Sequence, residues 1–223
     1  MTALTLADDR FDDNGHLVLF ENISRDLLHK GYSINPYALP LGLAENLLEH
    51  LQQMPEVAFS AAGVGRQQDY SLNGFVRSNQ IAWIEGNSDA GAQWLQWVQD
   101  LQTYLNRRLF LGLFSFESHF AHYASGDFYK RHVDAFKGQA NRVISLIVYL
   151  NRDWNPADGG ELVIYQDSTD WEGIRVTPAF GTVVAFISED FPHEVLPARR
   201  DRYSIAGWYR LNGSQPDRID PPN

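Results

Sequence analysis

The feature that most restricts the fold of this chain is a series of short extended segments in its second half. Turn signals at 138–139, 158–160 and 179–181 separate several of these segments. The expected strands cover residues 116–123, 128–134, 143–150, 161–165, 174–177, 182–187, 193–196 and 202–211. Eight consecutive strands without a sequence repeat predict a double-stranded β-helix, which is a jelly roll of two facing sheets.

Helical periodicity precedes the strands. Apolar residues recur at helical spacing over residues 41–54 and again over 94–105, and Ser88 or Asp89 can cap the second helix. The fold class is therefore mainly β with supporting helices, which we expect to pack on one sheet. Residues 60–74 between the two helices indicate a long loop, and both a lid and plain surface disorder remain open for it.

The length of 223 residues fits one domain with a single core. We divide residues 1–223 into a variable N-terminal segment (1–30), helical support with a mobile loop (31–115), a jelly-roll core (116–211) and a short tail (212–223). Nothing in the sequence requires an oligomer, so a monomer is expected.

The composition excludes several classes of partner and site. A formal net charge of −10 argues against binding to nucleic acid or to anionic membranes. The amino terminus becomes acidic at Asp8, and no apolar run approaches the roughly 20 residues of a membrane span, so a cytoplasmic protein is expected. The chain contains no cysteine, so any metal must be held by histidine nitrogen and by oxygen.

His132 and Asp134 lie two residues apart in an expected strand, so their side chains share a face. Alone, this pair is better explained as a surface ion pair. A later histidine, His193, changes the interpretation, because two imidazoles and one carboxylate can occupy one face of an Fe(II) octahedron and leave three positions open. Those positions suffice for a bidentate 2-oxo acid and dioxygen. A zinc hydrolase with these ligands would need a nearby general base.

Arg202 opens the last expected strand, nine residues after His193. A guanidinium can form a bidentate pair with a carboxylate, which suits the distal end of a dicarboxylate such as 2-oxoglutarate. Alternation along this strand places Arg202, Ser204 and Trp208 on one face, which is consistent with the lining of a pocket. The alternative is a solvated arginine in a basic stretch.

Taken together, these motifs resemble the 2-oxoglutarate- and Fe(II)-dependent prolyl 4-hydroxylases, specifically the hypoxia-inducible-factor prolyl hydroxylases of animals and their bacterial relatives. The resemblance covers about residues 30–211 in one order. It rests on Tyr129-Lys130-Arg131-His132-Val133-Asp134, Tyr149-Leu150-Asn151-Arg152-Asp153-Trp154, Gly159-Gly160-Glu161-Leu162, Pro192-His193-Glu194-Val195, Arg202-Tyr203-Ser204-Ile205-Ala206-Gly207-Trp208-Tyr209 and the segment 76–86.

The resemblance implies that His132, Asp134 and His193 bind Fe(II). It also implies that Arg202 and Tyr149 bind the distal carboxylate of 2-oxoglutarate, with ascorbate as a candidate reductant. Tyr149 ends an apolar strand, where a buried hydroxyl needs a polar partner. A core tyrosine bonded to backbone is the alternative for this residue.

Further residues resemble the family's lining near the iron and its substrate groove. Tyr123, Tyr129 and Trp208 match the aromatic lining, although aromatic residues on strands often belong to an ordinary core. Arg142 and Arg77 match positions beside the groove and its mobile loop, although surface arginines need no function. Asn79 stands where an acidic residue is usual in the animal proteins, which leaves the choice of substrate open.

The activity that the resemblance implies is hydroxylation of a prolyl residue in a protein to 4-hydroxyproline. Dioxygen and 2-oxoglutarate are consumed, and succinate and CO2 are released. The expected partner is a protein that presents proline in a loop or extended segment, and elongation factor Tu is a candidate for a bacterial relative. Two alternatives remain, namely hydroxylation of a free amino acid or other small molecule, and a non-catalytic metal-binding module or sensor.

Overall fold

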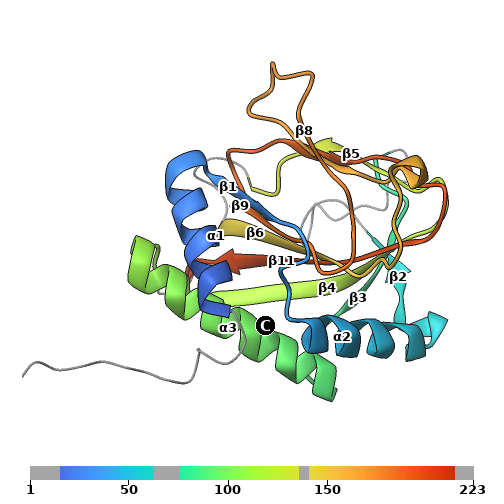
Figure 1. Ribbon diagram of the computed structural model, residues 1–223, viewed down its shortest axis with the longest axis horizontal. Helices are drawn as coiled ribbons and strands as arrows, with labels where there is room; N and C mark the ends of the chain where they lie inside the picture. Colours follow the sequence, from blue (N-terminus) through green and yellow to red (C-terminus); the bar gives the residue numbers. More distant parts are fainter. Residues whose placement is uncertain (1–15, 63–75, 136–140, 214–223) are drawn as a thin grey trace, which may run out of the picture.

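The computed structural model describes residues 16–62, 76–135 and 141–213 (Figure 1). The helices are α1 (His16–Lys30), α2 (Leu41–Gln53) and α3 (Asp89–Leu109). The strands are β1 (Tyr32–Asn35), β2 (Ser60–Ala61), β3 (Gln80–Trp83), β4 (Ser115–Tyr123), β5 (Tyr129–His132), β6 (Arg142–Tyr149), β7 (Leu162–Ile164), β8 (Ile174–Val176), β9 (Val183–Ile187), β10 (His193–Val195) and β11 (Arg202–Arg210).

The strands form two sheets that face each other. The major sheet has the order β1-β9-β6-β11-β4-β3-β2, and the minor sheet has the order β5-β10-β7-β8. Neighbouring strands pair antiparallel throughout, and the eight strands predicted from the sequence correspond in order to β4 through β11. The prediction of a mainly β double-stranded β-helix is confirmed. Three further strands, β1, β2 and β3, extend the edges of the major sheet and were not predicted.

The helices cover the outer face of the major sheet, while the minor sheet lies on its other side (Figure 1). Leu47 on α2 and Leu101 on α3 are completely buried against the outward-facing side chains of the sheet. Ser88 caps α3 by accepting a hydrogen bond from the amide of Gly91, as predicted. The prediction of helices packed on one sheet is thus confirmed.

Helix α1 was not predicted. Its apolar residues Leu19, Phe20, Ile23 and Leu27 are buried against α3 and the edge of the major sheet, but polar residues fill most of the remaining positions. The apolar stripe is therefore narrow. Much of the driving force for this helix comes from the surface that it covers, and a short sequence window does not contain that surface.

The space between the two sheets holds a second core, which contains Val184, Phe186 and Leu162. Toward one end of this space polar and charged side chains replace the apolar ones, and the site described below lies there. Most of the predicted loop at 60–74 lies outside the described residues, but Ser60 and Ala61 form β2 and pair with β3. Among the described residues no helix combines the length and apolar character needed to cross a bilayer.

Candidate functional site

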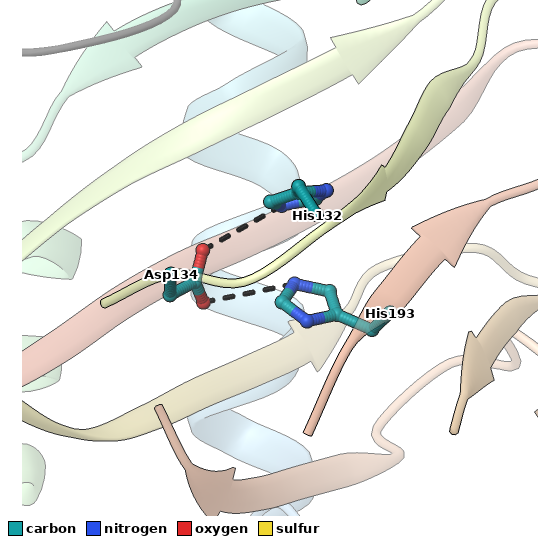
Figure 2. Close-up of side chains that lie close together, drawn as sticks. All are labelled: His132, Asp134 and His193. Carbon is teal, nitrogen blue, oxygen red and sulfur yellow. Dashed lines mark ion pairs between the residues drawn. The ribbon is translucent and has the colours of Figure 1, made fainter. Parts of the chain in front are cut away.

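His132, Asp134 and His193 converge between the two sheets (Figure 2). His132 is the last residue of β5, His193 is the first residue of β10, and the two are direct partners in the antiparallel ladder. The Nε2 atom of His132 lies 3.6 Å from Oδ1 of Asp134, and Nε2 of His193 lies 3.6 Å from Oδ2. One ligand atom from each residue falls within 4.8 Å of the others, so the three can hold a metal ion.

Both imidazoles are oriented by backbone carbonyl groups. Nδ1 of His132 lies 2.8 Å from the oxygen of Lys130, and Nδ1 of His193 lies 3.1 Å from the oxygen of Phe191. A carbonyl only accepts, so each Nδ1 carries the proton and each Nε2 keeps its lone pair for a metal. Burial, and to a lesser degree the nearby His132, lower the pKa of His193 to about 4, so His193 is a neutral imidazole. This donor set fits a divalent metal such as Fe(II).

Asp134 lies just beyond β5, because the strand ends at His132 and not at Asp134 as predicted. The chain bends there, and the carboxylate reaches back toward both imidazoles. Its Oδ2 accepts a hydrogen bond of 2.6 Å from Ser145 Oγ on β6, and Ser145 lies 2.9 Å from Ser188 Oγ. Burial raises the pKa of Asp134, but the two imidazoles and the serine hydroxyl together lower it well below its usual range. Asp134 is therefore an ionised acceptor.

Arg202 is almost completely buried at the start of β11. Its Nε donates to the backbone oxygen of Gly160 at 2.8 Å, and its Nη1 lies 3.4 Å from Ser204 Oγ. No acidic side chain pairs with this guanidinium within the described ranges, although a buried permanent charge normally has a carboxylate partner. The arrangement suits an anionic ligand that completes the pair.

Two tyrosines flank that guanidinium. The rings of Tyr123 on β4 and Tyr149 on β6 have their centroids 4.9 Å and 5.0 Å from Arg202 Cζ. The Tyr149 hydroxyl is buried without a hydrogen-bond partner in the described structure, and burial raises its pKa to about 12. A neutral O–H donor without an acceptor beside an unpaired cation fits a bound carboxylate. The alternative of a core tyrosine bonded to backbone is not what the structure shows.

Tyr129 and Arg77 lie at the metal side of the site. The Tyr129 ring stacks on His132 with a centroid distance of 3.5 Å. Arg77 Cζ lies 4.3 Å from the centroid of the same Tyr129 ring. Arg77 Nε donates to Oδ1 of the buried Asn79 at 2.9 Å. An uncharged amide thus supports Arg77 at the position where the sequence departs from the animal pattern.

Trp208 and Arg142 form a second aromatic and cationic pair on the inner face of the major sheet. Arg142 Cζ lies 3.6 Å from the Trp208 ring, and Arg142 Nη2 binds Glu117 at 2.7 Å. The buried His119 contacts Trp208 edge to face, with ring centroids 5.5 Å apart. Trp208 is the direct ladder partner of Ser145, so Trp208 and Arg142 lie next to the serine that donates to Asp134.

A hairpin between β7 and β8 projects beside β5 (Figure 1). Arg131, the residue before His132, holds it by donating to the backbone oxygens of Asp167 and Asp170, the latter at 2.8 Å. The guanidinium also covers the Tyr165 ring at 3.7 Å. Trp171 on this hairpin is 85% exposed.

The structure brings together the predicted residues in three groups, one around His132, one around Arg202 and one formed by Arg142 and Trp208. Sequence reasoning did not identify the contacts of Ser145, Gly160 and His119 with these groups. Ser145 lies four residues before Tyr149 in the same strand and therefore on the same face, and this spacing was the one sequence feature that pointed to a place for Ser145 in the site. Gly160 acts through its backbone oxygen, which no side-chain pattern reveals.

Comparisons with known proteins agree with this geometry. The 2OG-Fe(II) oxygenase superfamily matches residues 118–210. A crystal structure of a prolyl-4-hydroxylase from Pseudomonas putida superposes with a TM-score of 0.77 at 36% identity, covering 87% of this chain and all of that one. A prolyl hydroxylase from Trichoplax adhaerens, solved in complex with a hypoxia inducible factor oxygen degradation domain peptide fragment, gives 0.75 at 27% identity, covering 87% and 90%.

Egl nine homolog 1 of Homo sapiens is 31% identical over 157 residues, which cover 66% of this chain and 35% of that protein. The chain thus spans about a third of the length of this curated relative. A double-stranded β-helix with a His-Asp-His cluster defines the class as 2-oxoglutarate and Fe(II) oxygenases. Within that class, the chain belongs to the prolyl 4-hydroxylase family.

Proposed function

We propose that this protein is a 2-oxoglutarate- and Fe(II)-dependent dioxygenase that hydroxylates a prolyl residue of a protein to 4-hydroxyproline. The observation that carries the proposal is the presence of two incomplete sites in the space between the sheets. One is the ligand cluster of His132, Asp134 and His193, and the other is the buried Arg202 beside the unpartnered hydroxyl of Tyr149. A 2-oxo dicarboxylate completes both at once.

The residues of the chain divide the work of binding. His132, Asp134 and His193 hold the metal on one side, with both Nε2 lone pairs directed by the backbone. Arg202 and Tyr149 bind the distal carboxylate of 2-oxoglutarate, and Tyr123 packs against the guanidinium on its other side. The bound iron and 2-oxoglutarate supply the oxidising chemistry, in which one oxygen atom of O2 enters the substrate C–H bond while succinate and CO2 are released.

Substrate binding is assigned to the aromatic and cationic residues around the metal cluster, which are Tyr129, Trp208, Arg142 and Arg77. Proline lacks an amide N–H, and its ring packs well on aromatic faces. The Trichoplax adhaerens relative binds a peptide fragment, which supports a protein substrate here. Elongation factor Tu remains the candidate named from the sequence. A monomeric state, a cytoplasmic location and ascorbate as a reductant also remain predictions from the sequence.

The test is incubation of the iron-loaded protein with 2-oxoglutarate, O2 and purified elongation factor Tu, and separately with cell extract. We expect succinate formation and the gain of one oxygen atom on a proline in a defined peptide, measured by mass spectrometry. An oxygen gained by a free amino acid would favour the small-molecule alternative. Absence of 2-oxoglutarate binding and of succinate under both conditions would favour a non-catalytic metal-binding module.

A further inference from the structure

Asp134 is held by a chain of two buried serines, and the chemistry of the groups fixes the direction of the hydrogen bonds. An ionised carboxylate only accepts, so Ser145 must use its single proton on Asp134 Oδ2 at 2.6 Å. The oxygen of Ser145 can then only accept from Ser188, which lies 2.9 Å away. The result is a relay from Ser188 through Ser145 to Asp134. Both serines are at most 1% exposed.

The backbone alone does not choose which carboxylate oxygen of Asp134 faces the metal. Asp134 lies in a bend outside the strand ladder, and its two oxygens are equally far from the imidazoles, at 3.6 Å from His132 and 3.6 Å from His193. The hydroxyl of Ser145 breaks this symmetry, because it engages only Oδ2. The hydrogen bond withdraws electron density from Oδ2 and leaves Oδ1 as the better donor.

The number of bound oxygens matters for the reaction. Two imidazoles and one carboxylate oxygen fill three positions of an octahedron, and the other three admit a bidentate 2-oxo acid and dioxygen. A carboxylate that binds through both oxygens takes a fourth position. The 2-oxo acid then fills the remaining two, and dioxygen has none.

We infer that Ser145, oriented by Ser188, is a positioning residue that holds Asp134 as a ligand through Oδ1 alone and so keeps a coordination position open for dioxygen. The inference rests on the proposed function, and it deepens that function by assigning a role to a residue that binds neither metal nor substrate. A merely structural role for Ser145 would affect stability but not the coordination of the metal.

The test compares Ser145→Ala, Ser145→Thr and wild type by anaerobic titration with Mn(II) and by the visible absorption of the anaerobic Fe(II) and 2-oxoglutarate complex. Loss of an outer-shell hydrogen bond typically weakens metal binding by about 10- to 100-fold. We expect a loss of that size and a shifted absorption band in Ser145→Ala. We also expect recovery in Ser145→Thr, which keeps the hydroxyl, and a lower ratio of product to 2-oxoglutarate consumed in the alanine variant.

The matched control is Ser118→Ala, a buried serine of the same sheet whose oxygen accepts from Trp94 Nε1 on the helix side. It should leave Mn(II) affinity and the absorption band unchanged. If Ser145→Ala does not fold, Ser188→Ala replaces it, and a smaller loss of Mn(II) affinity is expected. Wild-type affinity and an unchanged band in the folded serine variant would overturn the inference. The Mn(II) titration needs no turnover, so absence of turnover in wild type counts against the proposed function alone.

Discussion

The two ends of the site between the sheets are built from different kinds of backbone. The metal end (His132, Asp134 and His193) comes from the ends of two short strands of the minor sheet and from a bend, whereas the carboxylate end (Arg202 and Tyr149) comes from the ends of two long strands of the major sheet. Side chains at the metal end therefore need supporting hydrogen bonds from carbonyls and serines. At the carboxylate end the ladder already fixes the side chains, and the ligand supplies the missing partner. Substitutions at the metal end should therefore weaken metal binding, whereas substitutions at the carboxylate end should weaken 2-oxoglutarate binding.

The largest effect is expected from Asp134→Ala at the metal end. Its removal leaves two imidazoles without the only anionic ligand, so Mn(II) binding and succinate formation should fall to background. The measurement is anaerobic metal titration together with turnover. Glu49→Gln, a change on the exposed surface of α2, is the control and should match wild type. Retention of wild-type metal affinity in Asp134→Ala would remove this residue from the ligand set.

Arg202→Ala should produce the next largest effect, at the carboxylate end. Removing one partner of a buried charge pair costs about 2–5 kcal/mol, so the affinity for 2-oxoglutarate should fall roughly 30- to 4,000-fold. Metal affinity should stay near wild type, since this end does not bind the metal. Equilibrium binding of 2-oxoglutarate in the presence of Mn(II) provides the measurement. The exposed neighbour Arg200→Ala is the control, and equal affinities for both variants would contradict the assignment.

Tyr149→Phe should have a smaller effect on the same ligand. A hydrogen bond to a charged group contributes about 1.5–3 kcal/mol, so 2-oxoglutarate should bind roughly 10- to 150-fold more weakly. The hydroxyl has no hydrogen-bond partner among the residues that the structure describes, so the free energy of unfolding should not fall. Tyr209→Phe offers the opposite pattern, because that buried hydroxyl already donates to the oxygen of Val98 at 2.8 Å. It should lose about 1 kcal/mol of stability and no ligand affinity.

The smallest effect is expected at His119. This histidine is buried but is not part of the metal cluster, so it tests whether burial alone lowers a histidine pKa in this protein. Burial, with Arg77 and Arg142 nearby, lowers the pKa of His119 from 6.5 to about 3. The unfolded chain therefore takes up a proton below pH 6.5 that the native protein does not, so stability falls as the pH drops toward 3. Between pH 7 and pH 5.5 this contribution is about 1 kcal/mol.

Between pH 7 and pH 5.5, the free energy of unfolding of His119→Leu should fall by about 1 kcal/mol less than that of wild type. The measurement is urea unfolding of the metal-free protein at both pH values. The other histidines, His193 included, keep their own contributions in both proteins, so only the difference between variant and wild type is compared. An identical pH dependence would mean that His119 titrates normally.

The sequence predicted the regular parts of this molecule well and the irregular parts less well. The eight strands of the jelly roll and the helices at 41–54 and 94–105 were recognisable, because alternation and helical periodicity are local properties. The motif around His132 and the arginine at position 202 were also readable, because their side-chain types carry the chemistry.

Other features depend on residues that are distant in the sequence. The support of Asp134 by Ser145 and Ser188, and the backbone oxygen of Gly160 that binds Arg202, exist only once the two sheets face each other. Helix α1 likewise depends on the surface that it covers. The strand predicted at 128–134 begins one residue later and ends two residues earlier than expected, because the alternation continues into the bend that brings Asp134 toward His193.

Two adjacent residues of β5 have different roles, since His132 belongs to the metal cluster and Arg131 holds the β7–β8 hairpin. His132 faces Asp134 and His193, while Arg131 holds the hairpin that carries Trp171 by donating to the backbone oxygens of Asp167 and Asp170. These bonds use main-chain oxygens, while the carboxylates of Asp167 and Asp170 accept hydrogen bonds from backbone amides of the same hairpin and so shape its turn. The hairpin is thus a place to graft a new recognition sequence, provided that Arg131, Asp167 and Asp170 are retained.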